Sequence, residues 1–344
     1  MEPHFVNSLW RQSAERLVRK RQSLSADLQC DVAIIGAGYS GLWTAFYLKK
    51  LAPDCRIVIF ESNQIGFGAS GRNGGWCSGF LPVTLGELEK THGRIAAIEM
   101  YKESFRTLDE IENVITDLQI DCDYYRGGTI NGANNLVQKS RVDAEISEMR
   151  RFGFGEDDYR TLTREELSNR LNIDDVITAS YTPHCAALNP AKLVQGLANA
   201  VENLGVEIYE NTNVVEYADR HVKTQNHGCK ANIVIRATEG FTSQIKRHRR
   251  TLAPLYSYMV ATEPLTPRQL STLGWQNRET YHDARNMIIY AQLTQDNRIA
   301  FGGRGAPYHF ASRVKPQYDV HTEIHEKIIR SMRDVFRVSR ELEV

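Results

Sequence analysis

The sequence predicts an α/β protein with two domains, one built on a doubly wound, Rossmann-like sheet and the other on a mixed sheet with helices. Three observations support this prediction. Residues 30–62 read as strand, tight turn, helix and strand around a GxGxxG motif. Alternating helix and strand signals return at residues 186–250, and short strand-like runs dominate from residue 251 onward. With 344 residues, the chain is long enough for two domains.

The first element is a buried strand at residues 32–35, followed by three glycines with distinct roles. Gly36 permits the turn, Gly38 lets a pyrophosphate approach the helix N-terminus, and Gly41 lets helix and strand pack closely. Glu61 follows the second strand, where a carboxylate can accept hydrogen bonds from ribose hydroxyls. The pattern predicts dinucleotide binding. The alternative is a tight strand-to-helix turn followed by a surface glutamate.

A second glycine-rich stretch, GASGRNGGWCSGF at residues 68–80, favours FAD over NAD as the bound dinucleotide. FAD is longer, so its flavin end calls for a second run of close backbone donors beyond the acidic residue. We expect close contact at three glycines, hydrogen bonds from two polar side chains and charge compensation from an arginine. These residues are Gly71, Gly74 and Gly75, then Ser70 and Asn73, then Arg72. The alternative is a flexible surface loop.

The remaining elements follow in order along the chain. Residues 87–118 predict one long helix whose apolar stripe is core, namely Ile95, Ile98, Phe105, Leu108, Ile111, Ile115 and Leu118. Thr163 and Glu166 form a capping box, and Asn189 with Pro190 begins a helix that Gly205 closes. Strands are expected in VEIYE, NVVEY, ANIVIR, APLYSYMVATEPL, NMIIYAQL and RIAFGG. We therefore predict an FAD-binding domain at 28–118 and 186–250, and a substrate domain at 119–185 and 251–330.

Composition and charge exclude several classes of partner. The 42 basic and 42 acidic residues cancel, so nothing draws the chain toward nucleic acid or an anionic membrane. The basic clusters at 16–21 and 246–250 are interpreted as solvated or helix-end charges. No apolar run approaches the roughly 18 residues of a membrane span. The six cysteines show neither CxxC nor metal spacing, and His321 and His325 lack a third ligand, so we expect a reducing cytoplasmic setting and no metal.

Several motifs in order resemble the D-amino-acid-oxidase (DAO) superfamily of FAD-dependent amine oxidoreductases, in its gamma-glutamylputrescine oxidoreductase-like branch. They are GAGYSG with Glu61, ASGRNGG, PHCAALNPAKLVQGLA, IRATEGFT, ATEPL and FGGRGAPY. The resemblance implies a glutathione-reductase/DAO-type fold and non-covalent FAD, with Val215 beside the adenine and Thr238 near the phosphates. The implied cofactor-contacting set is Gly36, Gly38, Ser40, Gly41, Glu61, Ser62, Ser70, Gly71, Arg72, Asn73, Gly74, Gly75, Val215 and Thr238.

The resemblance also implies a closing strand, glycine-rich loop and helix beyond Val344, where this sequence ends. From that difference we expect weak or absent FAD and little turnover in the chain as it stands.

The implied reaction is hydride transfer from the carbon bearing a neutral amine to flavin N5, which requires no dedicated catalytic base. The partner is then a small-molecule amine, and the oligomeric state is left open. Candidate substrate contacts in the second domain are Tyr258, His282, Asp283, Arg285, Tyr290 and Arg304. Two alternatives remain, a non-catalytic remnant of such an enzyme and an NAD-dependent dehydrogenase. The second glycine-rich stretch disfavours the latter.

Overall fold

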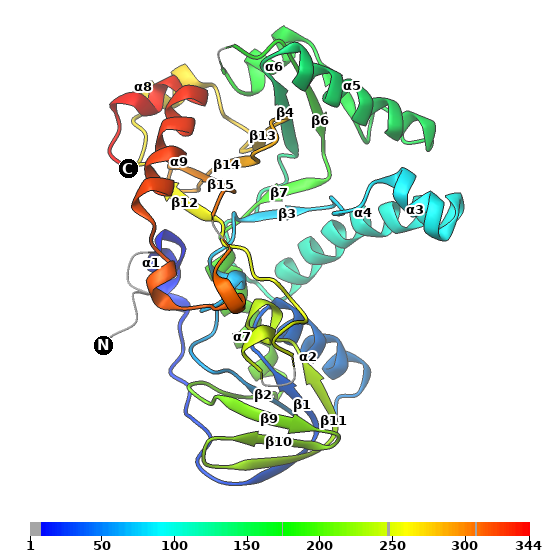
Figure 1. Ribbon diagram of the computed structural model, residues 1–344, viewed down its shortest axis with the longest axis vertical. Coiled ribbons are helices and arrows are strands. Elements are labelled where there is room, and N and C mark those ends of the chain that lie inside the picture. The colour runs from blue at the N-terminus through cyan, green and yellow to red at the C-terminus, as the bar shows by residue number, and fades with distance from the viewer. Residues whose placement is uncertain (1–7, 174, 246–247, 307) are drawn as a thin grey trace.

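The computed structural model describes residues 8–173, 175–245, 248–306 and 308–344. Within these ranges the strands form a six-stranded sheet, a seven-stranded sheet and a two-stranded ribbon. Figure 1 shows the six-stranded sheet at the bottom, the seven-stranded sheet at the top, and the ribbon of β3 (Trp76–Ser78) and β7 (Cys185–Ala187) between them. The predicted α/β class with a second, mixed sheet is confirmed. Part of the basic cluster at 246–250, residues 246–247, lies outside the described residues.

The six-stranded sheet has the order β8-β2-β1-β11-β10-β9, parallel over its first four strands and antiparallel over the rest. Strand β1, near the centre of the sheet, is buried at residues 32–35 because apolar side chains pack on both of its faces. Helices supply them on one face, and side chains of neighbouring strands, including β9 and β10, form the cluster on the other. The strands are β1 (Leu28–Ile35), β2 (Ile57–Phe60), β8 (Glu207–Tyr209), β9 (Val214–Ala218), β10 (His221–Thr224) and β11 (Gly228–Arg236).

Two helices cover one face of this sheet, α2 (Tyr39–Leu51) and α7 (Pro190–Asn203). Ile34 of β1 packs in one cluster with Leu42 of α2 and Leu197 of α7, and all three are fully buried. The opposite face carries a smaller cluster. Short helical segments complete the chain, namely α1 (Leu9–Ala14) and 3₁₀ turns at Glu15–Leu17, Ala69–Gly71, Glu239–Gln244, Phe310–Ser312, Pro316–Tyr318 and Arg337–Glu341.

The seven-stranded sheet has the order β12-β15-β14-β13-β4-β6-β5, antiparallel except where β13 runs parallel to β4. One face packs a large apolar cluster against α6, α8 and α9, while α5 contacts β4 and β6. These elements are β4 (Thr129–Ala133), α5 (Leu136–Arg151), β5 (Arg160–Leu162), α6 (Arg164–Arg170), β6 (Thr178–Thr182), β12 (Tyr258–Ala261), α8 (Pro267–Leu273), β13 (Thr280–Asp283), β14 (Ile289–Leu293), β15 (Ile299–Gly303) and α9 (Thr322–Val335).

The predicted single helix at residues 87–118 is wrong. The segment forms two helices, α3 (Leu85–His92) and α4 (Arg94–Asp117), separated by Gly93 at φ 84° and ψ 159°. That conformation lies outside the helical region, so the hydrogen-bond ladder must stop and start again. Ile95, placed in the core stripe, is 80% exposed because it lies in the first turn after the break.

The β3–β7 ribbon, Trp76–Ser78 against Cys185–Ala187, joins the two larger sheets along the chain. β7 leads directly into α7, whose N-cap is Asn189, as predicted. The Asn189 side chain accepts hydrogen bonds from the amides of Ala191 (3.1 Å) and Lys192 (3.0 Å) and donates to the Ser13 hydroxyl (2.6 Å). The capping box of Thr163 and Glu166 is also confirmed.

Within the described residues, no helix combines the length and the apolar character that crossing a bilayer would require.

Replacing the buried cap tests how strongly α7 is tied to the N-terminal segment. Asn189→Ala should lower the free energy of unfolding by about 2 kcal/mol, because the helix loses its cap and the Ser13 hydroxyl loses the donor that ties it to α7. The matched control is Asn135→Ala, which removes an exposed cap with a single bond to the Gln138 amide and should cost about 1 kcal/mol. Urea denaturation followed by circular dichroism measures both. Equal losses would contradict the added role of burial.

Candidate functional site

A large cavity opens at the carboxyl end of β1, with a volume of about 690 Å³. This is the edge of a parallel sheet at which ligands bind in doubly wound folds, and the volume lies within the range of ligand sites. Its walls come from segments that are far apart in the sequence, at residues 35–38, 60–63, 66–70, 72, 212–215, 237–239, 241, 244–245, 314–315 and 319. The last group, around Lys315 and Asp319, carries no motif and was not predicted.

The glycine turn at the base of the cavity has the predicted geometry. Gly36 adopts φ +106°, and a Cβ on Gly41 would lie 2.1 Å from the Gly36 carbonyl oxygen. The turn therefore excludes side chains at both positions. α2 begins after Gly38, which has no side chain to cap the helix; the Tyr39 amide donates to the Ser70 hydroxyl, and the next two amides, of Ser40 and Gly41, are the ones that an anion could approach. Gly38 lines the cavity, whereas Ser40 and Gly41 are not among its lining residues.

Glu61 is held at the cavity wall by backbone amides. Its Oε2 accepts from the Ala37 amide at 3.0 Å and its Oε1 from the Asn63 amide at 2.9 Å. Burial raises the pKa of this carboxyl, and the amide bonds oppose the rise by stabilising the charged form. Oε1 also accepts from the Ser62 hydroxyl at 3.4 Å, so Oε2 is the oxygen with a second lone pair for a hydroxyl of a ligand. Ser62, Val215 and Thr238 line the same cavity.

The glycine loop, residues 68–75, has its first half at the cavity. The Ser70 hydroxyl accepts from the Tyr39 amide at 3.0 Å and lines the cavity together with Arg72. Arg72 forms an ion pair with Asp319 at 2.9 Å. Asn73 braces the loop from inside, since its Oδ1 accepts from the Gly75 amide at 2.8 Å and its amide donates to Ala69 O at 3.1 Å.

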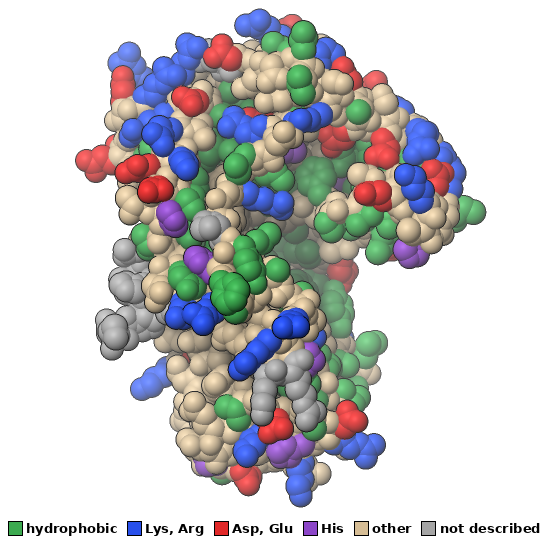
Figure 2. All heavy atoms as spheres, viewed as in Figure 1, with side chains coloured by type: hydrophobic (Ala, Val, Ile, Leu, Met, Phe, Trp, Pro, Cys, Tyr) green, Lys and Arg blue, Asp and Glu red, His purple; other side chains and the backbone are tan. Residues whose placement is uncertain are grey.

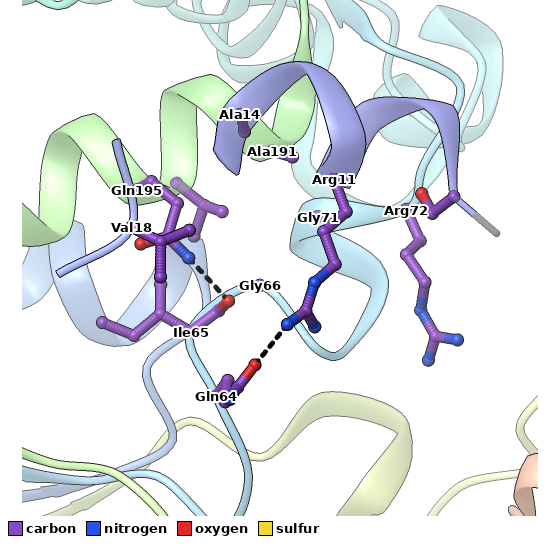
Figure 3. A pocket seen from close by; sticks show the side chains of 12 residues that line it. Arg11, Ala14, Val18, Gln64, Ile65, Gly66, Gly71, Arg72, Ala191 and Gln195 are labelled. Atoms are coloured by element: carbon purple, nitrogen blue, oxygen red, sulfur yellow. Dashed lines mark hydrogen bonds between the residues drawn. The ribbon is translucent and has the colours of Figure 1, made fainter. Parts of the chain in front are cut away.

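The N-terminal helix supports this loop from behind. The Trp10 indole donates to the Asn73 carbonyl at 3.0 Å. Figure 3 shows Arg11 reaching from α1 to Gln64 and Gln195 reaching from α7 to the Ile65 carbonyl, at 2.6 Å and 2.9 Å. A small recess that Gly71 also lines lies between these contacts. The glycine loop is thus held by parts of the chain on both sides of it in sequence.

The second half of the loop faces the seven-stranded sheet. A Cβ on Gly74 would lie 2.8 Å from the Tyr290 ring, and one on Gly75 only 2.0 Å from the Gln292 amide nitrogen. Gln292 donates to the carbonyls of Gly74 (2.8 Å), Gly75 (3.0 Å) and Leu188 (3.2 Å). In this structure the protein's own side chains occupy the space that these two glycines leave. Sequence reasoning missed Gln292, because a glutamine in a strand carries no motif.

Two predicted substrate contacts meet on the polar face of the seven-stranded sheet, beside this loop. The rings of His282 and Tyr290 lie 5.7 Å and 6.3 Å from Trp76, edge to face. The Tyr290 hydroxyl is 2.8 Å from the Ser257 hydroxyl. Trp76 Nε1, His282 Nε2 and Gln292 Oε1 are buried without a hydrogen-bond partner among the described residues. Such groups are rare in native proteins and suit a polar ligand.

Four other candidates lie elsewhere. Tyr258 belongs to the apolar face, where its hydroxyl donates to Tyr318 O at 2.6 Å and its ring contacts His325. Asp283 is buried and accepts two bonds of 2.7 Å from Arg285 Nε, which makes the pair a local structural contact. Arg304 is exposed at the end of β15.

Comparison with known proteins agrees with the geometry. The model of the family described as "DAO: FAD dependent oxidoreductase" matches residues 31–343. The chain belongs to the DAO family. Among curated proteins it is 28% identical to gamma-glutamylputrescine oxidoreductase of Escherichia coli over 82% of this chain and 66% of that protein. It is 27% identical to the probable oxidoreductase OrdL of Haemophilus influenzae over 79% of this chain and 64% of that protein. The chain therefore spans about two thirds of the length of these relatives.

Solved structures show the same fold. Glycine oxidase from Geobacillus kaustophilus superposes with a TM-score of 0.71 at 20% identity, over 92% of this chain and 80% of that one. L-proline dehydrogenase from P. horikoshii gives a TM-score of 0.68 at 19% identity, over 92% and 79%.

The described residues fit FAD, the cofactor of the DAO family. Gly36, Gly38 and the uncapped start of α2 would hold the pyrophosphate, and Glu61 would accept from the ribose. Trp76 directly follows Gly75, and its ring lies 5.7 Å from that of His282, so two unpartnered polar atoms belong to residues just beyond the glycine loop. The family match favours FAD over the NAD alternative.

Two glycines with positive φ values allow the cost of backbone strain to be separated from the cost of a lost contact. Gly75 (φ +69°) has Gln292 and Leu188 against it, whereas Gly93 (φ +84°) has nothing within 4 Å. Both Gly75→Ala and Gly93→Ala should cost about 1 kcal/mol through backbone strain. Gly75→Ala alone should also displace the loop from Gln292 and weaken FAD binding by on the order of ten-fold. FAD titration followed by flavin fluorescence compares the two, and unchanged affinity in Gly75→Ala would favour the surface-loop alternative.

Burial of His282 predicts a pH dependence of stability. Burial lowers the pKa of this imidazole from 6.5 to about 4, so the native state keeps it neutral where the unfolded chain already binds a proton. As pH falls from about 6.5 to about 4, protonation of this group in the unfolded chain should lower the free energy of unfolding by up to about 3 kcal/mol. Urea denaturation at pH 7 and pH 4.5 should show that the free energy of unfolding falls less between these pH values in His282→Gln than in the unchanged chain. His92→Gln, at an exposed position, serves as control and should behave like the unchanged chain.

Proposed function

We propose that the chain binds FAD and oxidises the C–N bond of a small amine or amino acid. The observation that carries the proposal is the path of the glycine loop. Ser70 lines the nucleotide cavity, and Gly74 and Gly75, only a few residues further, contact Tyr290 and Gln292 on the polar face of the other sheet. One short segment thus connects a site for the nucleotide with a face that can receive a substrate.

The chemistry that FAD supplies when bound is acceptance of a hydride at flavin N5 from the carbon that bears the substrate nitrogen. The residues of this chain would position that carbon. Trp76 and Tyr290 offer aromatic walls, and Tyr290 is fixed by its contact with Ser257. His282, neutral near pH 7, offers an unpartnered Nε2 to a polar group of the substrate without placing a positive charge beside an amine.

The names of the relatives and neighbours support an amine or amino acid as the substrate class. Gamma-glutamylputrescine oxidoreductase, glycine oxidase and L-proline dehydrogenase are each named for a compound with an oxidisable C–N bond. These names concern other proteins, and the electron acceptor and oligomeric state of this chain are separate questions.

We also assign residues 28–118 and 186–250 to the FAD-binding domain, and 119–185 and 251–330 to the substrate domain. The strand membership of the two large sheets supports this division. A reducing, cytoplasmic setting is proposed because all six cysteines are free, including Cys30 and Cys229, whose sulfur atoms lie 3.5 Å apart.

Anaerobic mixing of the FAD-loaded chain with candidate substrates tests the proposal. We expect a primary amine or a secondary amino acid to bleach the visible flavin absorbance, faster at higher pH as the substrate ammonium loses its proton. A hydroxy acid is the matched control and should have no effect. FAD should also protect the chain against thermal unfolding more than NAD does, because a ligand stabilises the state that binds it.

Three outcomes decide between the alternatives. Bleaching only by the hydroxy acid would contradict an amine substrate. Stoichiometric FAD that no substrate reduces would indicate the non-catalytic remnant. Stronger protection by NAD would contradict the flavin site.

A further inference from the structure

The polar face of the seven-stranded sheet extends beyond His282 to an unusual carboxylate on α5. Glu145 accepts a hydrogen bond from the Asn131 side-chain amide on β4 at 2.9 Å. Asn131 is 9% exposed, and its own Oδ1 is buried with no hydrogen-bond partner among the described residues. The pair therefore presents more hydrogen-bond acceptors than the surrounding protein satisfies.

No lysine, arginine or histidine in the described part of the chain pairs with Glu145. The other two acidic residues of α5 do have cationic partners, since Asp143 lies 2.6 Å from Lys139 and Glu148 lies 3.9 Å from Arg151. Burial raises the pKa of the Glu145 carboxyl, the Asn131 hydrogen bond opposes the rise, and the neighbouring Glu148 carboxylate adds to it. A carboxylate partly removed from water without a cation is costly, which favours a cation supplied by a ligand.

This carboxylate lies near the face that we assign to the substrate. Asn131 is the direct register partner of His282 across the parallel β4–β13 pair. The Phe80 ring lies 6.1 Å from the His282 ring and 6.4 Å from the Tyr159 ring, edge to face in both cases. Burial raises the pKa of the Tyr159 phenol, and the nearby Glu145 carboxylate raises it further. Aromatic rings thus connect His282 with the neighbourhood of Glu145.

Figure 2 shows that the molecule is hollowed on this side, with hydrophobic side chains in a recess between the seven-stranded sheet with α5 and the paired helices α3 and α4. Figure 1 places α5 above this recess, beside β4 and β6. An aromatic wall leading to an acceptor-rich end suits a substrate that has an apolar chain between two polar ends.

We propose that Glu145 and Asn131 form a specificity subsite for a second cationic group, an ammonium remote from the carbon that is oxidised. The proposal rests on the proposed function and narrows its substrate class to amines with two positively charged ends. An ammonium has three donors and no acceptor, which matches the unpaired acceptors of the Glu145–Asn131 pair. The partly exposed ring of Phe80 adds a favourable electrostatic contact with a cation that passes it.

Equilibrium binding tests the subsite without any turnover. Calorimetry of the FAD-loaded chain at neutral pH compares each of a series of linear diamines of three to six carbons with the n-alkylamine of the same length. We expect at least one diamine to bind about ten-fold more tightly than its matched monoamine, because only the diamine reaches Glu145. Glu145→Gln keeps the shape of the side chain and should remove that preference while leaving monoamine binding unchanged.

Glu148→Gln is the matched control, since it removes an acidic residue of the same helix that already has Arg151 beside it. It should retain the diamine preference. Equal binding of every diamine and its monoamine by the unchanged chain would overturn the subsite, as would the same preference in Glu145→Gln. If diamines bind preferentially but no amine reduces the flavin, the proposed oxidation fails and the subsite stands. If amines reduce the flavin with no diamine preference, the subsite alone fails.

Discussion

The side-chain amide of Gln292 holds three backbone carbonyls in place where the two large sheets meet. Its nitrogen lies 2.8 to 3.2 Å from the carbonyls of Gly74, Gly75 and Leu188, and the residue is 1% exposed. Gly75 precedes the β3–β7 ribbon and Leu188 precedes α7, so one buried group sets the position of the glycine loop and of a helix of the six-stranded sheet. The Leu188 amide also donates to the Gly75 carbonyl at 2.9 Å, so Gln292 strengthens a junction that backbone pairing already forms, and its loss would leave buried carbonyls with fewer donors.

The glycine loop depends on this contact because it has little structure of its own. Its ties come from Trp10 in the N-terminal helix, from Tyr39 at the start of α2 and from Asp319 near the C-terminal end. Each tie closes a long stretch of chain, so the loop conformation is a property of the folded whole. A cofactor site built this way is pre-organised by packing at both ends, and the two sheets cannot shift apart without disturbing it.

Local signals predicted local structure well. The turn at Gly36, the cap at Asn189 and the capping box at Thr163 each depend on a few neighbouring residues, and each has the expected geometry. The prediction of a single helix at 87–118 was wrong for a local reason that the apolar pattern does not show. A glycine at position 93 allows a backbone conformation that interrupts the ladder, and this outweighed the periodicity on either side of it.

The sequence by itself therefore determined the fold class, the glycine turn and the acidic residue at the end of β2, because each depends on residues close together in the chain. Only the tertiary structure decided which strand residues face the glycine loop. Tyr258 and Tyr290 look alike in sequence, yet pairing register turns the first toward α9 and the second toward Gly74. Gln292 and Glu145 gave no signal, since their roles arise from contacts 217 and 14 residues away along the chain. Register and distant packing are set by the whole folded chain, and no short window of sequence contains them.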